Sequence, residues 1–222
     1  MSNVIEMTDV NKVCGARVKS QILYGINLEI KEHSVNSIFG ASGSGKTTLL
    51  NIMGTLDKPS SGEVFVDGQN TNSMSKRKLA KLRNQAVGFI FQFHLLLPEF
   101  NVIHNVLMPC RIRRNFGSEA KERANRLLDL LGLYQYRGSN VLDLSGGQQQ
   151  RVAIARSLIN NPKIVLADEP TGNLDSHSSE NVYKIFQEVN QKYGVAFVIV
   201  THDKSLAQKT ERIIEIEDGR IL

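Results

Sequence analysis

The stretch that decides the fold of this chain reads Ser37-Ile38-Phe39-Gly40-Ala41-Ser42-Gly43-Ser44-Gly45-Lys46-Thr47-Thr48-Leu49-Leu50. An apolar run leads into a glycine-rich loop of the pattern Gly-x-x-x-x-Gly-Lys-Thr, and the start of a helical pattern follows it. This is the strand–loop–helix context in which such a loop binds phosphate. Glycines let backbone N–H groups turn inward around phosphate oxygens, and the helix N-terminus adds the positive end of its dipole. The stretch therefore predicts an α/β domain that binds a nucleotide.

The same loop predicts which side chains hold ATP and Mg²⁺. Lys46 is expected to reach the β- and γ-phosphates, and the hydroxyl of Thr47 is expected to coordinate Mg²⁺. The alternative is a glycine-rich turn that binds nothing, and the apolar run before the loop argues against it. The expected nucleotide-binding residues are Gly40, Ala41, Ser42, Gly43, Ser44, Gly45, Lys46, Thr47 and Thr48.

A second apolar run, residues 163–167, ends in Asp168 and Glu169. A buried parallel strand reads as a continuous apolar run, and ligands gather at its carboxyl end. Asp168 is expected to hold Mg²⁺, usually through water, and Glu169 to act as the base that orients the attacking water. The alternative is a solvated acidic turn, which the phosphate loop upstream argues against.

A third apolar run, residues 195–200, ends in Thr201-His202-Asp203. A lone histidine is more often structural than catalytic. His202 differs because it follows a strong strand at the end where ligands gather, so it could donate a hydrogen bond to a γ-phosphate. We therefore count His202 with Glu169, Lys46 and Gln92 as the expected catalytic residues.

The composition and the pattern of elements fit a single α/β domain of 222 residues. No apolar run approaches the ~18–20 residues needed to span a bilayer, and the start lacks a signal-peptide pattern. Two cysteines are too few for a disulfide framework, which fits a reducing compartment. We therefore expect a cytoplasmic protein whose link to a membrane is through a partner.

Strands and helices alternate except between residues 93 and 162, which read as mainly helical. Within that segment, residues 118–131 place apolar side chains on one helical face, and Gly132 follows as a helix-ending residue. Residues 63–92 are expected to add antiparallel strands around a turn at Asp67-Gly68. The expected organisation is a nucleotide-binding core, residues 1–92 and 163–222, interrupted by a helical subdomain, residues 93–162.

Six motifs in a fixed order carry a family resemblance over essentially the whole chain. The chain resembles the ATPase subunit of an ATP-binding cassette (ABC) transporter. The resemblance implies a P-loop NTPase core with a mainly parallel sheet, an antiparallel β subdomain and an inserted helical subdomain. The motifs are the phosphate loop at 40–47, Phe91-Gln92-Phe93, the signature Leu144-Ser145-Gly146-Gly147-Gln148, the acids Asp168-Glu169, Thr171-Gly172-Asn173-Leu174-Asp175, and His202.

This resemblance implies a homodimer in which two subunits close over two ATP molecules. Gln92 would contact Mg²⁺ and the water, and would couple the site to an integral-membrane permease. The signature residues Ser145, Gly146, Gly147 and Gln148 would contact the γ-phosphate of ATP held by the opposite subunit. Asp175 would communicate across the dimer interface. The transported substrate would contact the permease rather than this chain.

A narrower resemblance concerns the branch of the family. Residues 91–100 resemble the Gln-loop of the LolD-type lipoprotein-releasing ATPases. Residues 51–59 and 166–175 fit a wider group, which also contains MacB-like exporters and FtsE-like cell-division ATPases without a transported substrate. The sequence therefore favours lipoprotein release and leaves the other two roles open.

Two positions depart from the family pattern. The family usually has an aromatic residue near position 14, where adenine stacks, but this chain has Cys14. Stacking on a base is worth about 1–3 kcal/mol, so we expect adenine to be held weakly or by another residue, such as Tyr24 or Val18. His33 stands where a turn glycine is common. Because histidine tolerates a positive φ better than most residues, His33 indicates only a local backbone change.

The chain carries a net charge of +5, and residues 93–160 hold nine Lys and Arg against five Asp and Glu. The cluster Arg111–Arg114 would meet acidic loops or anionic headgroups, or would simply be a solvated face. Nucleic acid is not expected as a partner. DNA-repair members of the family need a long coiled coil before the signature, and Ser145 follows Lys46 by only 99 positions. Translation members carry two cassettes in one chain, and this chain has one.

Overall fold

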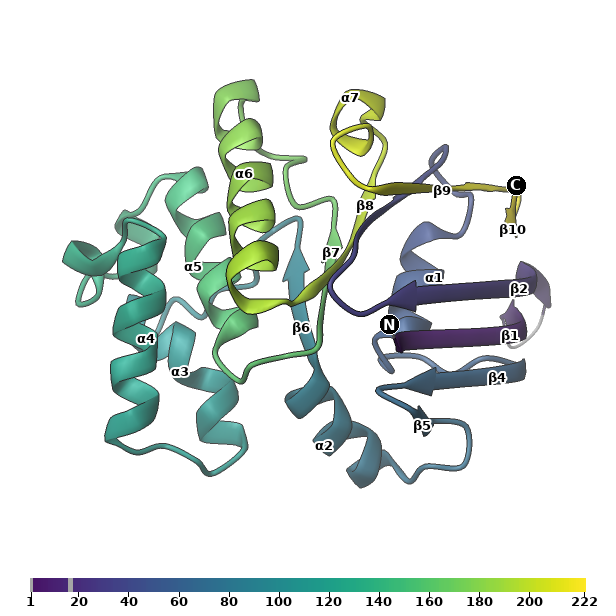
Figure 1. Ribbon diagram of the computed structural model, residues 1–222, viewed down its shortest axis with the longest axis horizontal. Helices are drawn as coiled ribbons and strands as arrows, with labels where there is room; N and C mark the ends of the chain where they lie inside the picture. Colours follow the sequence, from purple (N-terminus) through teal and green to yellow (C-terminus); the bar gives the residue numbers. More distant parts are fainter. Residues whose placement is uncertain (1, 16–17) are drawn as a thin grey trace.

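The structure is a computed structural model that describes residues 2–15 and 18–222, with only the backbone at residue 177. Two sheets lie side by side (Figure 1), one of four antiparallel strands and one of six mainly parallel strands. Helices cover both faces of the larger sheet. The described residues contain no helix that is both long and apolar enough to cross a membrane. The expected α/β class, with its antiparallel and helical parts, is confirmed.

The larger sheet has the strand order β10-β9-β3-β8-β7-β6, and only the pair β9–β10 is antiparallel. Strands β7 and β8 form because their residues are apolar in nearly unbroken runs, and both faces of β8 are buried. Its strands are β3 Val35–Phe39, β6 Val87–Phe91, β7 Ile164–Asp168, β8 Ala196–Thr201, β9 Arg212–Glu217 and β10 Arg220–Ile221.

The smaller sheet has the order β2-β1-β4-β5 and is antiparallel throughout. Its strands are β1 Asn3–Cys14, β2 Ser20–Lys31, β4 Ser61–Val66 and β5 Gln69–Asn70. The expected turn at Asp67-Gly68 joins β4 to β5, with φ of 48° and 68° at its two residues. Two consecutive positive φ values match the twist of a tight hairpin.

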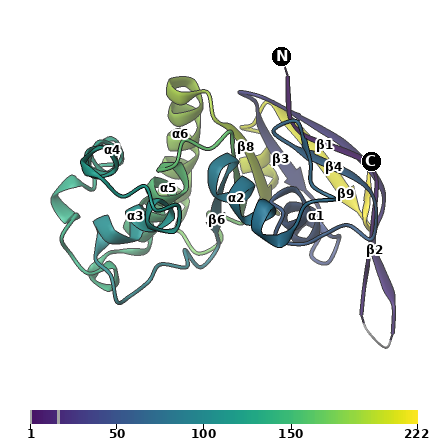
Figure 2. The same cartoon turned by 90° about the horizontal axis from the view of Figure 1, so that it is seen from below.

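Helices and the smaller sheet lie against the larger sheet (Figures 1 and 2). Two hydrophobic clusters hold these layers together, one on each face of the larger sheet. Successive residues of β7 point to opposite faces, so Ile164 and Leu166 join one cluster and Val165 and Ala167 the other. The first cluster is shared with α1, α2 and the antiparallel sheet, and the second with α3–α6. The α-helices are α1 Lys46–Met53, α2 Lys76–Ala86, α3 Val102–Ile112, α4 Ser118–Leu130, α5 Gly146–Leu158, α6 Ser176–Tyr193 and α7 Lys204–Ala207.

The segment from 63 to 92 differs from the expectation that it only adds antiparallel strands. Residues 76–86 form the helix α2, and β6 pairs in parallel with β7. Ser75 begins the helix, since its side chain accepts a hydrogen bond from the N–H of Lys78. Leu79, Leu82 and Ala86 are its buried residues. An apolar stripe of three residues among five cations is too short to stand out in sequence.

The segment 93–162 is helical in the structure, as expected. It contains α3, α4, α5 and two short 3₁₀ turns, Tyr134–Tyr136 and Val141–Asp143. Gly132 follows α4 with a φ of 66°, the left-handed conformation that ends many helices. These helices pack into the same hydrophobic cluster as the sheet. Their assignment as a subdomain with boundaries at 93 and 162 stays a prediction.

The backbone at His33 has a φ of 63°, so the expected local change at this turn is confirmed. The neighbouring helix α6 is tied to the turn, because the side-chain amide of Asn190 donates to the His33 carbonyl at 2.8 Å. The residue therefore belongs to the connection between β2 and β3, at the opposite end of β3 from the phosphate loop.

Gly88 on β6 gives a test of how closely α5 packs on the sheet. A Cβ at this position would lie 2.5 Å from the carbonyl oxygen of Ser157 and 3.0 Å from Cγ2 of Val165. Because the nearest obstacle is backbone, Gly88→Ala should destabilise the fold by about 1–3 kcal/mol, seen as a lower midpoint of urea unfolding. Gly138→Ala is the control, because a Cβ there meets no described atom within 4 Å. Equal midpoints for the two variants would contradict this packing.

Candidate active site

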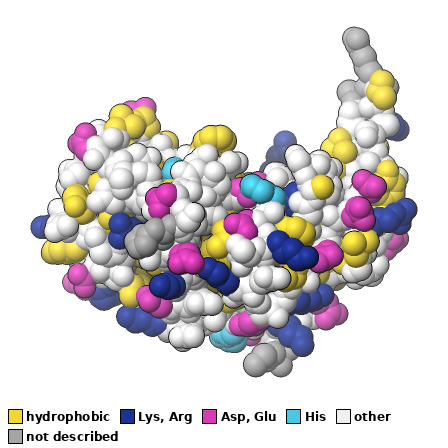
Figure 3. Space-filling model, turned by 90° about the horizontal axis from the view of Figure 1, so that it is seen from above, with side chains coloured by type: hydrophobic (Ala, Val, Ile, Leu, Met, Phe, Trp, Pro, Cys, Tyr) yellow, Lys and Arg dark blue, Asp and Glu magenta, His cyan; other side chains and the backbone are white. Residues whose placement is uncertain are grey.

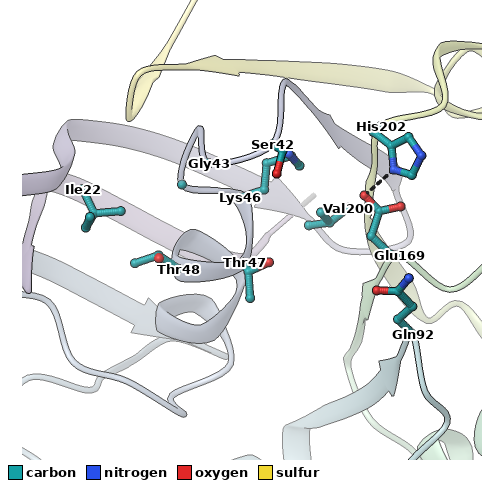
Figure 4. A pocket seen from close by; sticks show the side chains of 11 residues that line it. Ile22, Ser42, Gly43, Lys46, Thr47, Thr48, Gln92, Glu169, Val200 and His202 are labelled. Carbon is teal, nitrogen blue, oxygen red and sulfur yellow. Dashed lines mark hydrogen bonds and ion pairs between the residues drawn. The ribbon is translucent and has the colours of Figure 1, made fainter. Parts of the chain in front are cut away.

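A cavity of 490 Å³ opens at the edge of the larger sheet where β3, β7 and β8 end. Figure 3 shows a depression on this face with a histidine beside acidic side chains, and Figure 4 shows its residues close by. Most of the residues predicted from separate motifs meet here. The cavity is lined by Ile22, Ser42, Gly43, Gly45, Lys46, Thr47, Thr48, Gln92, Glu169, Val200 and His202.

The phosphate loop forms one wall. Gly43 and Gly45 adopt φ values of 82° and 102°, which favour glycine. A Cβ at Gly45 would lie 2.9 Å from Cδ2 of Leu23, so the antiparallel sheet presses against the loop. The ammonium of Lys46 donates to the carbonyls of Gly40 and Ala41, at 2.9 and 2.6 Å. The loop is thus held in shape by its own lysine and by the neighbouring sheet.

Thr47 and Asp168 face each other below the loop. The Thr47 hydroxyl donates to Oδ1 of Asp168 at 3.4 Å. A hydroxyl beside a carboxylate supplies the hard oxygen ligands that Mg²⁺ prefers, so these two residues fit the expected ion. Burial raises the pKa of Asp168, and the nearby charge of Glu169 raises it further, while Thr47 and Lys46 lower it. A bound cation would favour the ionised form.

Glu169 and His202 form a pair on one side of the cavity. His202 Nδ1 lies 2.9 Å from Oε1 of Glu169 (Figure 4). The His202 side chain is 71% exposed and that of Glu169 17%, so the imidazole stands at the cavity rim. The backbone of Glu169 has a φ of 47°, which is strained for a residue with a side chain. This conformation is held by the Glu169 N–H, which donates to the Val200 carbonyl at 3.0 Å.

Gln92 enters the cavity from the end of β6. Its side chain points toward Glu169 in Figure 4. It also packs against the 171–175 segment, because a Cβ at Gly172 would lie 2.8 Å from the Gln92 amide nitrogen. The Asn173 side chain donates to the Gln92 carbonyl at 3.0 Å. Sequence analysis missed this contact, which joins residues far apart in the chain and has no local signal.

The structure does not bring the signature to this cavity. None of the described residues 144–148 lines it. Instead Ser145 begins α5: its side chain accepts from the Gln148 N–H, and its own N–H donates to the Gln148 side chain at 2.9 Å. Asp175 begins α6 in the same way and accepts from Ser178 at 2.9 Å. The two helix starts adjoin, because a Cβ at Gly147 would lie 3.4 Å from the Ser178 hydroxyl.

Ile22 on β2 also lines the cavity beside the loop, although the sequence did not point to it. Cys14 is exposed at the end of β1 and is not among the lining residues. The ring of Tyr24 is covered by the Arg220 guanidinium at 4.8 Å, and Val18 is 83% exposed. Neither alternative to the missing aromatic therefore lines the cavity, and Ile22 supplies its apolar surface near the loop.

The raised pKa of Asp168 predicts that its charge costs stability. Because the folded-state pKa lies above the ordinary value, the ionised carboxylate weakens the fold at neutral pH. Asp168→Asn should therefore raise Tm at neutral pH. The gain should shrink as the pH falls and the wild-type carboxyl takes up its proton. Thermal unfolding over a pH series measures this, with Asp67→Asn at an exposed turn as the control. A lower Tm for Asp168→Asn at neutral pH would contradict the cause given.

Comparisons with known sequences agree with this geometry. The sequence model of the family described as ABC transporter matches residues 23–172. A lipoprotein-releasing system ATP-binding protein LolD from Bacteroides fragilis is 49% identical over 202 residues, which are 91% of this chain and 94% of the relative. The protein of the same name from Bacteroides thetaiotaomicron is 45% identical over 218 residues, 98% of this chain and 99% of the relative.

Solved structures agree as well. The dimeric structure of the ATP-binding cassette MJ0796, in a post-hydrolysis state bound to ADP and Pi, has a TM-score of 0.88 and 40% identity, covering 98% of this chain and 96% of that chain. CbiO1 from Clostridium perfringens, part of the ABC transporter complex cbiONQ, has a TM-score of 0.90 and 27% identity, covering 100% and 88%. The motifs, the fold and these relatives together place the chain in the ABC transporter family.

Proposed function

We propose that this protein is the ATPase subunit of a lipoprotein-releasing ABC transporter and works as a homodimer on a membrane permease. One observation carries the proposal. The cavity gathers the phosphate loop, Gln92, Glu169 and His202, whereas the signature lies outside it at the exposed start of another helix. A second copy of the chain would supply its signature to complete each site. The dimeric state of the cassette MJ0796 supports this arrangement.

The geometry supports a division of labour in ATP hydrolysis. Lys46 and the N–H groups of the loop bind the phosphates. Thr47, Asp168 and Gln92 would hold Mg²⁺, which when bound neutralises charge on the phosphate oxygens. Glu169 orients a water for attack on the γ-phosphorus and accepts its proton as the bond to the β-phosphate oxygen breaks, giving ADP and phosphate.

The two ring nitrogens of His202 would make two different contacts. With the proton on Nδ1, it donates to Glu169 Oε1 across the 2.9 Å contact and fixes the direction of that carboxylate. When the opposite ring nitrogen also carries a proton, it can donate a hydrogen bond to the γ-phosphate. Glu169 would keep its second oxygen for the water. The proposed role of His202 therefore combines positioning of the base with contact to the phosphate.

The partner's signature is suited to meet the γ-phosphate of ATP. Ser145 and Gln148 close a capping box, which leaves the start of α5 well ordered. Gly146 and Gly147 then let the backbone approach a phosphate closely, and the dipole of α5 favours its negative charge. Asp175, which begins the adjoining helix α6, is placed to communicate between the two sites of the dimer.

A groove of 400 Å³ between α2, α3 and the Gln-loop is the proposed permease-docking surface. Its lining includes Ala80, Leu95 and Ile112, and Leu95 and Ile112 are 57% and 70% exposed. A short helix of a permease could bury these apolar groups next to Gln92, as an amphipathic helix does in a groove. Such contact would link movement of the permease to the water-holding side of the cavity.

The basic cluster beside the groove divides into two parts. The Arg111 guanidinium packs 4.8 Å from the ring centre of Phe116 and 5.8 Å from that of Phe100, so it is a structural cation. Arg113 and Arg114 are exposed. Within this cluster, Arg113 and Arg114 are therefore the residues available to contact acidic loops of the permease.

Lipoprotein release is the proposed transport role because the relatives from both Bacteroides species carry that name and match most of this chain. Nothing in these comparisons favours the MacB-like or FtsE-like alternatives. The permease would hold the protein on the inner face of the membrane, and the lipoprotein would contact the permease alone.

The role of Glu169 has a direct test. Glu169→Gln keeps the size of the side chain but removes the base, so turnover should fall by about 10²–10⁴-fold while ATP still binds. The ATP-bound dimer should then persist and elute as a dimer in size exclusion. Glu63→Gln, an exposed acid on β4, is the control. Turnover near the wild-type rate in Glu169→Gln would exclude a base at this position.

A substitution in the groove tests whether the permease docks there. Ile112→Glu places a charge among its apolar lining, so co-purification with the co-encoded permease should be lost while the isolated subunit still hydrolyses ATP. Leu222→Glu is the matched control, since Leu222 is 75% exposed and lies outside the groove. Permease bound equally by both variants would show that this groove is not the docking surface.

The missing aromatic predicts weak recognition of the base. Ile22 gives apolar contact without hydrogen bonds, so preference for ATP over GTP should be well under tenfold, which is about 1.4 kcal/mol. Competition binding measures it. Cys14→Tyr should tighten ATP binding if the end of β1 can present a ring to the base. A hundredfold preference for ATP in the wild type would show that another residue reads adenine.

A further inference from the structure

Helix α5, which begins at the signature, also touches the backbone beside the proposed base. The side-chain amide of Gln150, one turn into the helix, donates to the carbonyl of Pro170 at 2.6 Å. Pro170 directly follows Glu169, whose φ of 47° is strained. Gln150 is fully buried. The hydrogen bond therefore fixes one end of the peptide chain that carries the strained carboxylate.

The amide of Gln150 is an unusual choice for this position. Its oxygen is buried and has no hydrogen-bond partner among the described residues. An apolar side chain of similar size would fill the space without leaving a buried acceptor unpaired. The gain must then come from the N–H₂ group, whose hydrogen bond to the Pro170 carbonyl is short. The donor, rather than the volume, explains a glutamine here.

The third turn of the same helix makes a second contact of this kind. The two terminal nitrogens of Arg156 donate to the carbonyls of Leu95 and His94, at 2.6 and 2.7 Å. Both of those residues have positive φ, 47° and 60°. They lie just after Gln92, and Leu95 lines the docking groove. A guanidinium presents its two terminal nitrogens in a fixed plane, one to each carbonyl, whereas an ammonium is a single point of charge without that fixed fork.

We propose that α5 is a brace for both strained segments, with Gln150 as the positioning residue of Glu169 and Arg156 as the positioning residue of Gln92. The inference rests on the proposed function, because it assigns both residues to ATP hydrolysis. In this arrangement one helix makes three contacts that bear on hydrolysis. The start of α5 meets the partner's ATP, its second turn sets the base, and its third turn sets the Gln-loop. A subunit would hydrolyse its own ATP only when its α5 is seated on the partner's nucleotide.

Gln150→Met removes the donor and keeps the size of the side chain. The expected result is a kcat at least tenfold below wild type, with KM for ATP and Tm close to wild type. Asn36→Leu is the matched control, since Asn36 is a buried amide that donates to the Phe197 carbonyl far from the cavity. That variant should lose Tm and keep kcat. Gln150→Glu, which replaces the donor with an acceptor, gives a second measurement if the Met variant does not fold.

Arg156 is tested through Gln92. Arg156→Lys keeps the charge but removes the planar pair of donors, so the two carbonyls should be held less firmly and kcat should fall severalfold. In a Gln92→Ala background the same change should have no further effect, because the residue through which it acts is gone. By contrast, Gln150→Met should still lower kcat in that background. A structural role for Arg156 would lower Tm and kcat equally in both backgrounds.

The outcomes separate this inference from the proposed function. A wild-type chain that binds but does not hydrolyse ATP would refute the proposed function. If the wild type hydrolyses ATP and both Gln150 variants match its kcat, the brace to Glu169 is refuted. The same holds if their loss of kcat merely follows a loss of Tm. If Arg156→Lys lowers kcat equally with and without Gln92, the brace to the Gln-loop is refuted.

Discussion

Parallel pairing of β8 with β3 and β7 is the interaction on which the site depends. Phe39 pairs with Thr201, and Asp168 pairs with Val200, so the three strands end at one edge of the sheet. The residues that follow them are the phosphate loop, Glu169 and His202, which are far apart in the chain. Burial of the strands on both faces sets their register and therefore the distances between the proposed catalytic groups. A slip of one residue would exchange the two buried faces and separate the groups.

The backbone is strained at this edge of the sheet, where the polar residues of the site are held in place. Glu169, His94 and Leu95 hold left-handed backbone conformations, each costing of order 1–3 kcal/mol. Such conformations persist only where surrounding contacts determine them. Here the contacts come from the Val200 carbonyl and from Arg156 on α5. Asp168 adds an electrostatic cost, since burial opposes its charge. Stability is lowered at the points where chemistry needs a fixed direction or a charge.

Some helices could be assigned from the sequence and others could not, because only some of them carry a strong local signal. Residues 118–131 could be assigned from sequence, because their apolar face and the following glycine act within one helix. Residues 76–86 could not, because only three of their side chains are buried and the rest of the helix is basic and polar. The antiparallel sheet was likewise foreseen only in part. In the 12-residue strands β1 and β2, apolar and polar residues do not alternate regularly enough to predict which strand pairs with which. Bulges also shift the register of this pair.

The sequence by itself determined the phosphate loop, the acid pair Asp168-Glu169, the position of His202 and the order of motifs that identifies the family. These depend on residue type within short segments, where backbone geometry and chemistry act locally. Only the tertiary structure decided that His202 touches Glu169, that Ile22 rather than Tyr24 or Val18 borders the loop, and that the signature lies outside its own cavity. Those facts depend on how strands and helices pack, and packing joins residues whose separation along the chain carries no signal.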